Sequence, residues 1–329
     1  YVTDLVKQTA EVLGKAEDVE KYGRLYEETL EAFRQEYYTS TGRIVSETQT
    51  GAILSLYFNL AREKDRPRIL QTLLTNIENH KNHLATGFVG TPYICHALSE
   101  NGAHEMASTL FMKEDYPSWL YSVNMGATTI WERWDSIKPD GTFDESGMNS
   151  LNHYANGSVG DWMYRKVAGL SQLKPGYKKF KVQPMFVKGM EEAGVEFDSV
   201  YGRIESKWSC KDGKIRVKVV VPANTTAVIC LPEKEETLEV GSGVYEYEYD
   251  TETSLAYERF SMDSTLADII AQPLAVEMFN QFAPGSLEGP MIQFAMQMTL
   301  SEMLGAAPEA RPMYEAIVHA LNAQERQNG

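Results

Sequence analysis

The sequence is poor in cysteine, in positive charge and in long apolar runs. Three cysteines scattered over 329 residues are too few for a disulfide framework. The formal net charge of -15 argues against nucleic acid and anionic membranes as partners, because binding a polyanion requires clustered Lys and Arg. No apolar run approaches the ~18 residues that cross a bilayer. These absences favour an ordinary globular protein, and 43% hydrophobic residues can build a substantial core.

Several well-known catalytic and metal-binding motifs are also absent. The chain has no HExxH, no paired CxxC, no GxxxxGK[ST] and no GxSxG, so zinc-protease, P-loop and hydrolase-elbow chemistry lack support. We expect no cofactor and no metal, although calcium held by scattered loop oxygens stays open. Cys95, Cys210 and Cys230 are expected to be buried free thiols, unless Cys210 and Cys230 face each other on neighbouring strands.

The chain begins at Tyr1, without an initiator Met and already inside a helical pattern. We therefore expect a piece of a longer protein, cytoplasmic in location, with an upstream signal peptide left open.

The periodicity is helical from Thr3 to about Leu170. Apolar residues recur three or four positions apart, as in Val19, Tyr22, Tyr26, Leu30, Phe33 and Tyr37. Further helical segments are predicted at about 47–63, 66–83, 92–100, 103–113 and 147–169. No strand pattern interrupts them, which favours an all-α layered or toroidal domain.

The period changes to two after Leu170. Ile204, Ser206 and Trp208 alternate with charged residues, Asp212-Gly213 supplies a hairpin turn, and Ile215, Val217 and Val219 alternate in the same way. Tyr245, Tyr247 and Tyr249 form another such run. These strands predict an antiparallel β-sandwich over 171–253.

The residues after 253 return to short helical patterns, at about 264–281, 290–304 and 309–326, separated by Pro and Gly. We predict a helical C-terminal appendage over 254–329 whose role the sequence does not reveal.

The stretch Gly126-Ala127-Thr128-Thr129-Ile130-Trp131-Glu132-Arg133-Trp134-Asp135 places a carboxylate between two indoles. Burial raises the pKa of a carboxyl group and nearby cations such as Arg133 lower it, so Glu132 could be tuned for acid or base work. Sugar rings stack on indole faces, which makes a carbohydrate site the leading functional reading. An interfacial Glu between two packing Trp residues is the alternative.

A second polar cluster follows. Asn149, Asn152, His153 and Asn156 recur at helical spacing, so one face of a helix start would present amides and an imidazole together. Helix capping with a satisfied buried His is the alternative. Asp161 precedes Arg165 by one turn, which indicates an intrahelical ion pair.

The strings GATTIWERWDS and MNSLNHYANGSVGDWMYRKVAGL resemble the bacterial α-L-rhamnosidases of glycoside hydrolase family 78. TGRIVSETQTGAILSLYFNLA, GFVGTPY and YPSWLYSVNMGATT precede them in the family's order, and the resemblance covers about residues 1–190. It implies the C-terminal part of an (α/α)6 catalytic barrel over 1–170, followed by the β-sandwich. The expected fold is thus multidomain, with a partial barrel, a sandwich and a helical appendage.

The resemblance also implies hydrolysis of terminal, non-reducing α-L-rhamnosyl units with inversion. Glu132 then stands where the family has its general base, and His153 where it has a sugar-binding histidine; Trp131 is a further candidate for sugar contact and Trp119 a weaker one. The expected partner is a rhamnose-containing glycoside.

The family's general acid belongs to a segment upstream of the first helix in this sequence. We therefore expect the chain alone to have little or no activity, since each catalytic group contributes ~10²–10⁴ in rate. An exposed part-barrel would need cover from another copy, another chain or rearranged helices, so a homo-oligomer stays open. The alternatives are a carbohydrate-binding or structural fragment without catalysis, and another (α/α)6 glycosidase or glycoside phosphorylase.

Overall fold

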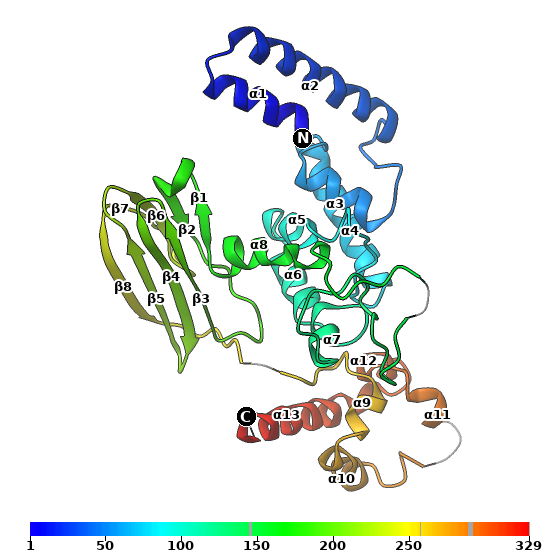
Figure 1. Cartoon of the computed structure of the whole chain (residues 1–329). Helices are drawn as coiled ribbons and strands as arrows, with labels where there is room; N and C mark the ends of the chain where they lie inside the picture. Colours follow the sequence, from blue (N-terminus) through cyan, green and yellow to red (C-terminus); the bar gives the residue numbers. More distant parts are fainter. Residues whose placement is uncertain (145–146, 257, 289–291, 329) are drawn as a thin grey trace. The chain divides into compact units, whose positions relative to one another are not determined.

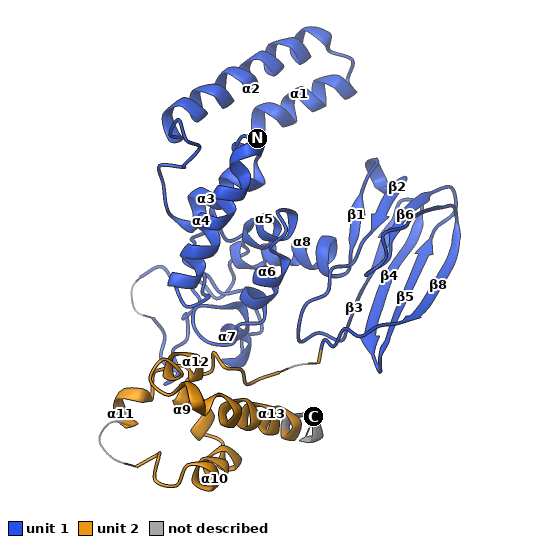
Figure 2. Cartoon of the chain, turned by 180° about the vertical axis from the view of Figure 1, so that it is seen from behind, with its two compact units in different colours: residues 1–255 blue, residues 256–329 orange. Residues whose placement is uncertain are grey.

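The computed structural model describes residues 1–144, 147–256, 258–288 and 292–328. The chain divides into two compact units, residues 1–255 and residues 256–329 (Figure 2). Unit 1 combines helices with a β-sandwich, and unit 2 is helical (Figure 1). This order of helical region, sheets and helical end confirms the predicted fold class, while the predicted boundary at residue 170 stays a prediction.

Eight α-helices are described in unit 1. They are α1 (Val2–Val12), α2 (Ala16–Tyr37), α3 (Gln49–Tyr57), α4 (Arg66–Asn79), α5 (Ile94–Glu100), α6 (His104–Phe111), α7 (Trp119–Asn124) and α8 (Val159–Trp162). Successive helices pack in pairs, α1 with α2, α3 with α4 and α5 with α6. No helix of the described residues has the length and apolarity that spanning a bilayer requires.

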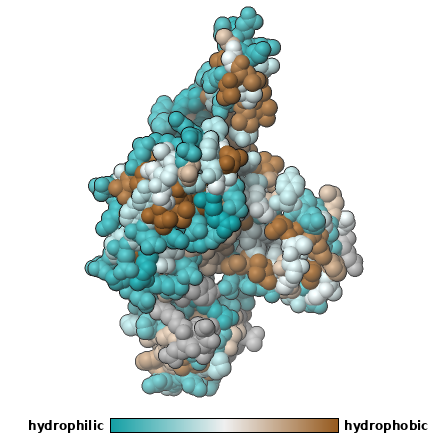
Figure 3. Space-filling view, turned by 60° about the vertical axis from the view of Figure 1, so that its left-hand side comes forward, coloured by the Kyte–Doolittle hydropathy of each residue, from teal (hydrophilic) through white to brown (hydrophobic). Residues whose placement is uncertain are grey.

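The core of the helical region lies among α3 to α6. Leu73, Ile77, Ile94 and Leu98 there have no exposed surface, in agreement with their helical spacing. The α1–α2 hairpin is different, because Ala10 is its one buried residue in α1 and Leu30 in α2. Several of its apolar side chains, among them Val2, Val12 and Leu25, therefore remain exposed, and hydrophobic residues are visible at the top of Figure 3.

The prediction of a helix over 147–169 is wrong for its first residues. Residues 149–153 are irregular, and the helical turns begin with a 3₁₀ turn at Ala155–Ser158, continue as α8 and end in a π-turn at Met163–Val167. Main-chain bonds from this segment go to residues 130 and 132 instead of forming a helix. Asn149, Asn152, His153 and Asn156 therefore do not share one helix face. The predicted Asp161–Arg165 ion pair is confirmed at 3.3 Å.

Two four-stranded sheets form the sandwich. The first has the order β1 (Leu170–Gln172), β2 (Lys179–Val182), β6 (Thr226–Cys230), β7 (Thr237–Val240); the second has β3 (Glu192–Ser199), β4 (Gly202–Lys211), β5 (Lys214–Val221), β8 (Gly243–Asp250). The strands of the described residues pair antiparallel, except β2 with β6, which are parallel. The predicted alternation holds, since Ile204, Trp208 and Ile215 face the core. Asp212 and Gly213 make the hairpin turn with positive φ angles of 55° and 70°.

The cysteines are free thiols, as expected. Cys95 and Cys210 are buried and Cys230 is half-buried. Cys210 lies on β4 and Cys230 on β6, which belong to different sheets, so the two are not on neighbouring strands. Burial raises the pKa of Cys95 to about 12, which excludes a reactive thiolate there.

Unit 2 contains α9 (Leu266–Ile270), α10 (Pro273–Phe282), α11 (Ile292–Ala295), α12 (Leu300–Met303) and α13 (Arg311–Asn328). Residues 290 and 291 of the predicted segment 290–304 lie outside the described residues. The unit has its own core, with Leu266, Ile269, Leu300 and Ile317 fully buried.

An internal repeat organises unit 2. Thr265-Leu266-Ala267-Asp268 recurs as Thr299-Leu300-Ser301-Glu302. Each copy starts a short helix with a capping box, in which the Thr hydroxyl and the acidic side chain three positions later satisfy each other's backbone N–H groups. The two threonines pair through an antiparallel bridge, so the copies meet at their helix starts.

Candidate active site

Glu132 lies on an irregular segment between α7 and the 3₁₀ turn and is held by Ser150. The main-chain N–H of Glu132 donates to the Ser150 carbonyl at 2.8 Å, and the Ser150 N–H donates back to Glu132 Oε2 at 2.8 Å. The carboxylate is half-buried, with one oxygen fixed by a main-chain donor. Such a bond orients the group while the second oxygen, Oε1, can bind another molecule.

His153 is tied to the same segment from the other side. Its main-chain N–H donates to the Ile130 carbonyl at 2.8 Å, and its Nδ1 accepts the N–H of Ala155 at 3.3 Å. In the neutral ring this contact places the proton on Nε2, which can then donate to a hydroxyl group. The ring stacks on Phe88, with centroids 4.5 Å apart and planes 21° from parallel.

A cleft of about 210 Å³ opens beside Glu132. Its lining consists of Thr86, Gly87, Phe88, Tyr116, Glu132, Arg133, Trp134, Asp135 and Asn156. The volume is below the roughly 300–1,000 Å³ of sites for drug-sized ligands, which suits a single sugar ring. Glu132 lies in this cleft, and His153 lies next to it through the ring contact with Phe88.

The tryptophans of this region divide into packing and lining residues. Trp131 is 4% exposed and is not part of the cleft lining, whereas Trp134 lines the cleft. Trp119 is also buried; its ring meets Trp134 edge-on at 5.4 Å, and its indole N–H donates to the Asn156 carbonyl at 2.8 Å. The indole available to a ligand is thus Trp134, which our reading of the sequence did not select.

Arg133 supplies positive charge at the cleft and is shared with two carboxylates. It lies 3.4 Å from Asp135 Oδ1 and 3.5 Å from Asp144 Oδ2. The hydrogen bond with Asp135 is the main reason why the pKa of Arg133 is raised. The cleft therefore has Glu132 beside a second carboxylate, Asp135, that is held in an ion pair.

Sequence reasoning did not select Phe88 or Trp134, and it placed Asn156 wrongly. Phe88 stands in the GFVGTPY string and Trp134 in the string around Glu132, so their presence in family-like motifs was the available signal. Asn156 was noticed as part of a helix face that does not exist.

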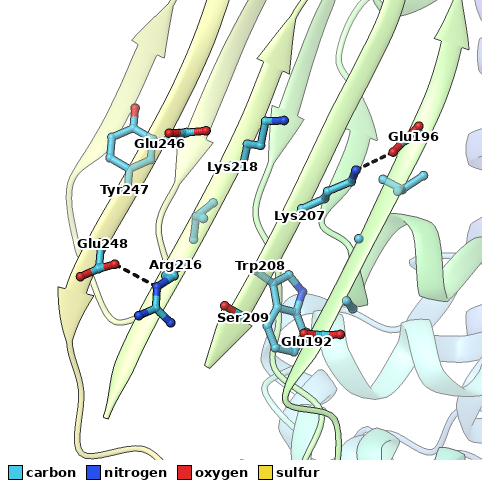
Figure 4. A pocket seen from close by; sticks show the side chains of 14 residues that line it. Glu192, Glu196, Lys207, Trp208, Ser209, Arg216, Lys218, Glu246, Tyr247 and Glu248 are labelled. Carbon is cyan, nitrogen blue, oxygen red and sulfur yellow. Dashed lines mark hydrogen bonds and ion pairs between the residues drawn. The ribbon is translucent and has the colours of Figure 1, made fainter. Parts of the chain in front are cut away.

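A larger hollow, about 920 Å³, lies on the outer face of the sheet β3-β4-β5-β8 (Figure 4). Its floor is covered by ion pairs between neighbouring strands, such as Lys207 with Glu196 and Arg216 with Glu248. None of the residues predicted for the active site lines it. Among the described residues, no group of three or more His, Cys, Asp or Glu is placed to hold a metal ion.

Comparison with known proteins gives matches for both regions of unit 1. Residues 1–167 match the model of the bacterial alpha-L-rhamnosidase 6 hairpin glycosidase domain, and residues 169–246 match that of the bacterial alpha-L-rhamnosidase C-terminal domain. An alpha-L-rhamnosidase of Formosa agariphila is 41% identical over 72% of this chain and 26% of its own length. One of Streptomyces avermitilis is 38% identical over 70% of this chain and 22% of its own length.

Solved structures agree with these sequence matches. The alpha-L-rhamnosidase of Aspergillus terreus superposes with a TM-score of 0.72 at 35% identity, covering 75% of this chain and 29% of that one. The Streptomyces avermitilis enzyme in complex with L-rhamnose also gives 0.72, at 34% identity, covering 75% and 26%. The chain thus spans about a quarter of the length of the relatives that it matches. On these matches and this fold, the chain belongs to the bacterial α-L-rhamnosidase family.

Proposed function

We propose that this chain forms part of an inverting α-L-rhamnosidase, which removes terminal α-L-rhamnosyl units from glycosides. The observation that carries the proposal is the position of Glu132: a half-buried carboxylate in a cleft of single-sugar size, with Oε2 bound to the Ser150 N–H. A relative that covers 75% of this chain has been solved in complex with L-rhamnose, which supports the choice of sugar.

Glu132 acts as the general base in this proposal. Inverting hydrolysis uses two carboxyl groups about 6.5–9.5 Å apart, one to protonate the departing oxygen and one to deprotonate a water molecule on the opposite face of the ring. Because Ser150 holds Oε2, the carboxylate is fixed in orientation and Oε1 can accept the proton of the attacking water. The attacking oxygen then bonds to the anomeric carbon as the glycosidic bond breaks.

The sugar is held by the rings around the cleft. We propose that Nε2 of His153 donates to a sugar hydroxyl and that Phe88 and Trp134 offer apolar surface to the ring. Trp131 stays a predicted sugar contact, but its 4% exposure favours a role in supporting Glu132 from behind. No metal ion or cofactor has a role in this scheme.

The Glu132→Gln substitution tests the assignment in the protein at its full natural length. Gln keeps the shape of the side chain but cannot take a proton, so turnover of an aryl α-L-rhamnoside should fall by about 10²–10⁴. Binding of L-rhamnose, measured by calorimetry, should change little. Glu105→Gln, at an exposed position in the first turn of α6, is the matched control. Parental turnover in Glu132→Gln would remove Glu132 from the mechanism.

The alternative function is sugar binding without catalysis, in which the same cleft holds the sugar without cleaving it. Binding of L-rhamnose without any turnover by the full-length protein would select it. A panel of other aryl glycosides distinguishes rhamnose from a different sugar.

A further inference from the structure

The segment that carries Glu132 has no regular secondary structure to hold it. Residues 128–135 form neither helix nor strand, so their position depends on individual bonds to neighbouring segments. Ser150 and His153 supply main-chain bonds on one side. A misplacement of about 1 Å can cost on the order of 10²-fold in rate, so whatever else fixes this segment matters for the proposed reaction.

Asn156 provides a further tie. Its Nδ2 lies 3.3 Å from the carbonyl oxygen of Trp131 and 3.5 Å from that of Glu132. The two acceptors are consecutive carbonyls, so the amide group contacts the peptide groups on both sides of the Glu132 Cα atom. Because both acceptors are oxygens, the nitrogen of the carboxamide must face them, which fixes the orientation of the side chain.

The main chain of Asn156 is anchored as well. Its carbonyl accepts the indole N–H of Trp119, at the start of α7, at 2.8 Å. Asn156 therefore joins three segments, namely α7, the Glu132 segment and the 3₁₀ turn that follows His153. It is 6% exposed, and burying an amide costs free energy unless hydrogen bonds replace its contacts with water.

We propose that Asn156 is a positioning residue, which sets the place of the Glu132 carboxylate in the cleft through the two carbonyls that its amide binds. This inference rests on the proposed function, in which Glu132 is the general base. Loss of the N–H donors would let the Glu132 segment shift, while Phe88, which lies on another segment of the cleft lining, would keep its place. The expected loss is therefore in kcat, with substrate binding largely kept.

The test is Asn156→Asp in the full-length protein, assayed on an aryl α-L-rhamnoside. Asp has the same shape but lacks both N–H donors and turns an oxygen toward two carbonyls. The expected result is a 10–100-fold lower kcat with KM changed less than about threefold. Asn156→Ala is the second variant, in case the buried Asp prevents folding, and it should show the same division between kcat and KM.

Asn322→Asp in unit 2 is a matched control. Asn322 is 4% exposed, and its side chain binds the main-chain N–H and carbonyl of Phe260 at 2.9 and 2.7 Å. The same chemical change there should lower the thermal midpoint without lowering kcat, which separates a positioning effect from general destabilisation.

The outcomes are distinct. The positioning role is wrong if a soluble Asn156→Asp or Asn156→Ala variant has the same kcat as the unsubstituted protein. It is also wrong if Asn322→Asp lowers kcat to the same extent. Glu132→Gln is measured alongside: if it retains activity, the proposed function fails. If it is inactive while Asn156→Asp keeps parental kcat, the positioning inference alone fails.

Discussion

At the scale of single residues, the segment that contains Glu132 and the segment that contains His153 lie side by side in the structure. The spacing of residues in the sequence does not predict the contacts that bring them together. Glu132 and His153 come together through main-chain bonds between segments 130–132 and 150–153. The motifs singled out both residues. The positions of Asn156 and Trp134 in the cleft lining could not be predicted, because which side chain lines a cleft depends on packing around an irregular loop rather than on any periodicity.

Asp161 gives a residue-level prediction about pH. Its Oδ2 lies 2.9 Å from Nε2 of His96, which is 1% exposed, although the ring is poorly aligned for a hydrogen bond. The contact with His96 lowers the pKa of Asp161 from 3.8, burial opposes this, and Arg165 lowers it further. A lowered folded pKa stabilises the fold above about pH 3.8, and this contribution is lost as the pH falls through the folded value.

We therefore expect Asp161→Asn to reduce the free energy of unfolding at pH 7 and to reduce it less near pH 3, below the unfolded pKa, where the contribution is being lost. Urea unfolding at the two pH values measures this. An equal loss at both would show that the effect comes from packing and not from the charge.

At the scale of elements, the regular segments follow the sequence closely. The β4–β5 hairpin was predictable because alternation and a turn that favours positive φ agree over the whole stretch. The start of the predicted helix 147–169 failed, because residues 149–153 use their main-chain groups to hold residues 130 and 132. The repeat in unit 2 escaped notice because its two copies share only a short capping motif.

The capping boxes of unit 2 give a prediction at this scale. Thr265→Ala and Thr299→Ala should each lower its free energy of unfolding by about 1 kcal/mol, because each removes the acceptor for a backbone N–H at a helix start. Ser301→Ala, an exposed position in α12, should change it by less than about 0.5 kcal/mol. Residues 256–329 have their own core, so denaturant unfolding of this segment alone is the measurement. Equal effects of all three substitutions would contradict the capping assignment.

At the scale of the whole molecule, the chain covers about a quarter of its relatives and exposes apolar surface in its helical region. Val12 and Leu13 of the α1–α2 hairpin are 86% and 64% exposed. Exposed apolar residues grouped on a helix pair are typical of a surface that another protein segment covers. The sequence predicted these helices but could not show which of their faces is left uncovered.

The proposal assigns one of the two catalytic carboxyl groups to these 329 residues. We expect the isolated chain to hydrolyse an aryl α-L-rhamnoside at least about 10²-fold more slowly than a full-length enzyme, since the proton donor would be lacking. Calorimetry with L-rhamnose on the same sample shows whether the cleft is formed. Full turnover by the isolated chain would mean that both groups lie within it.

The most direct measurement is a crystal structure of the full-length protein with bound L-rhamnose. The account predicts the sugar in the cleft of Glu132, against Phe88 and Trp134, with the anomeric carbon facing the Glu132 carboxylate across the space of one water molecule. Rhamnose bound only in the hollow of the sheet β3-β4-β5-β8, or with its anomeric carbon turned away from Glu132, would contradict it.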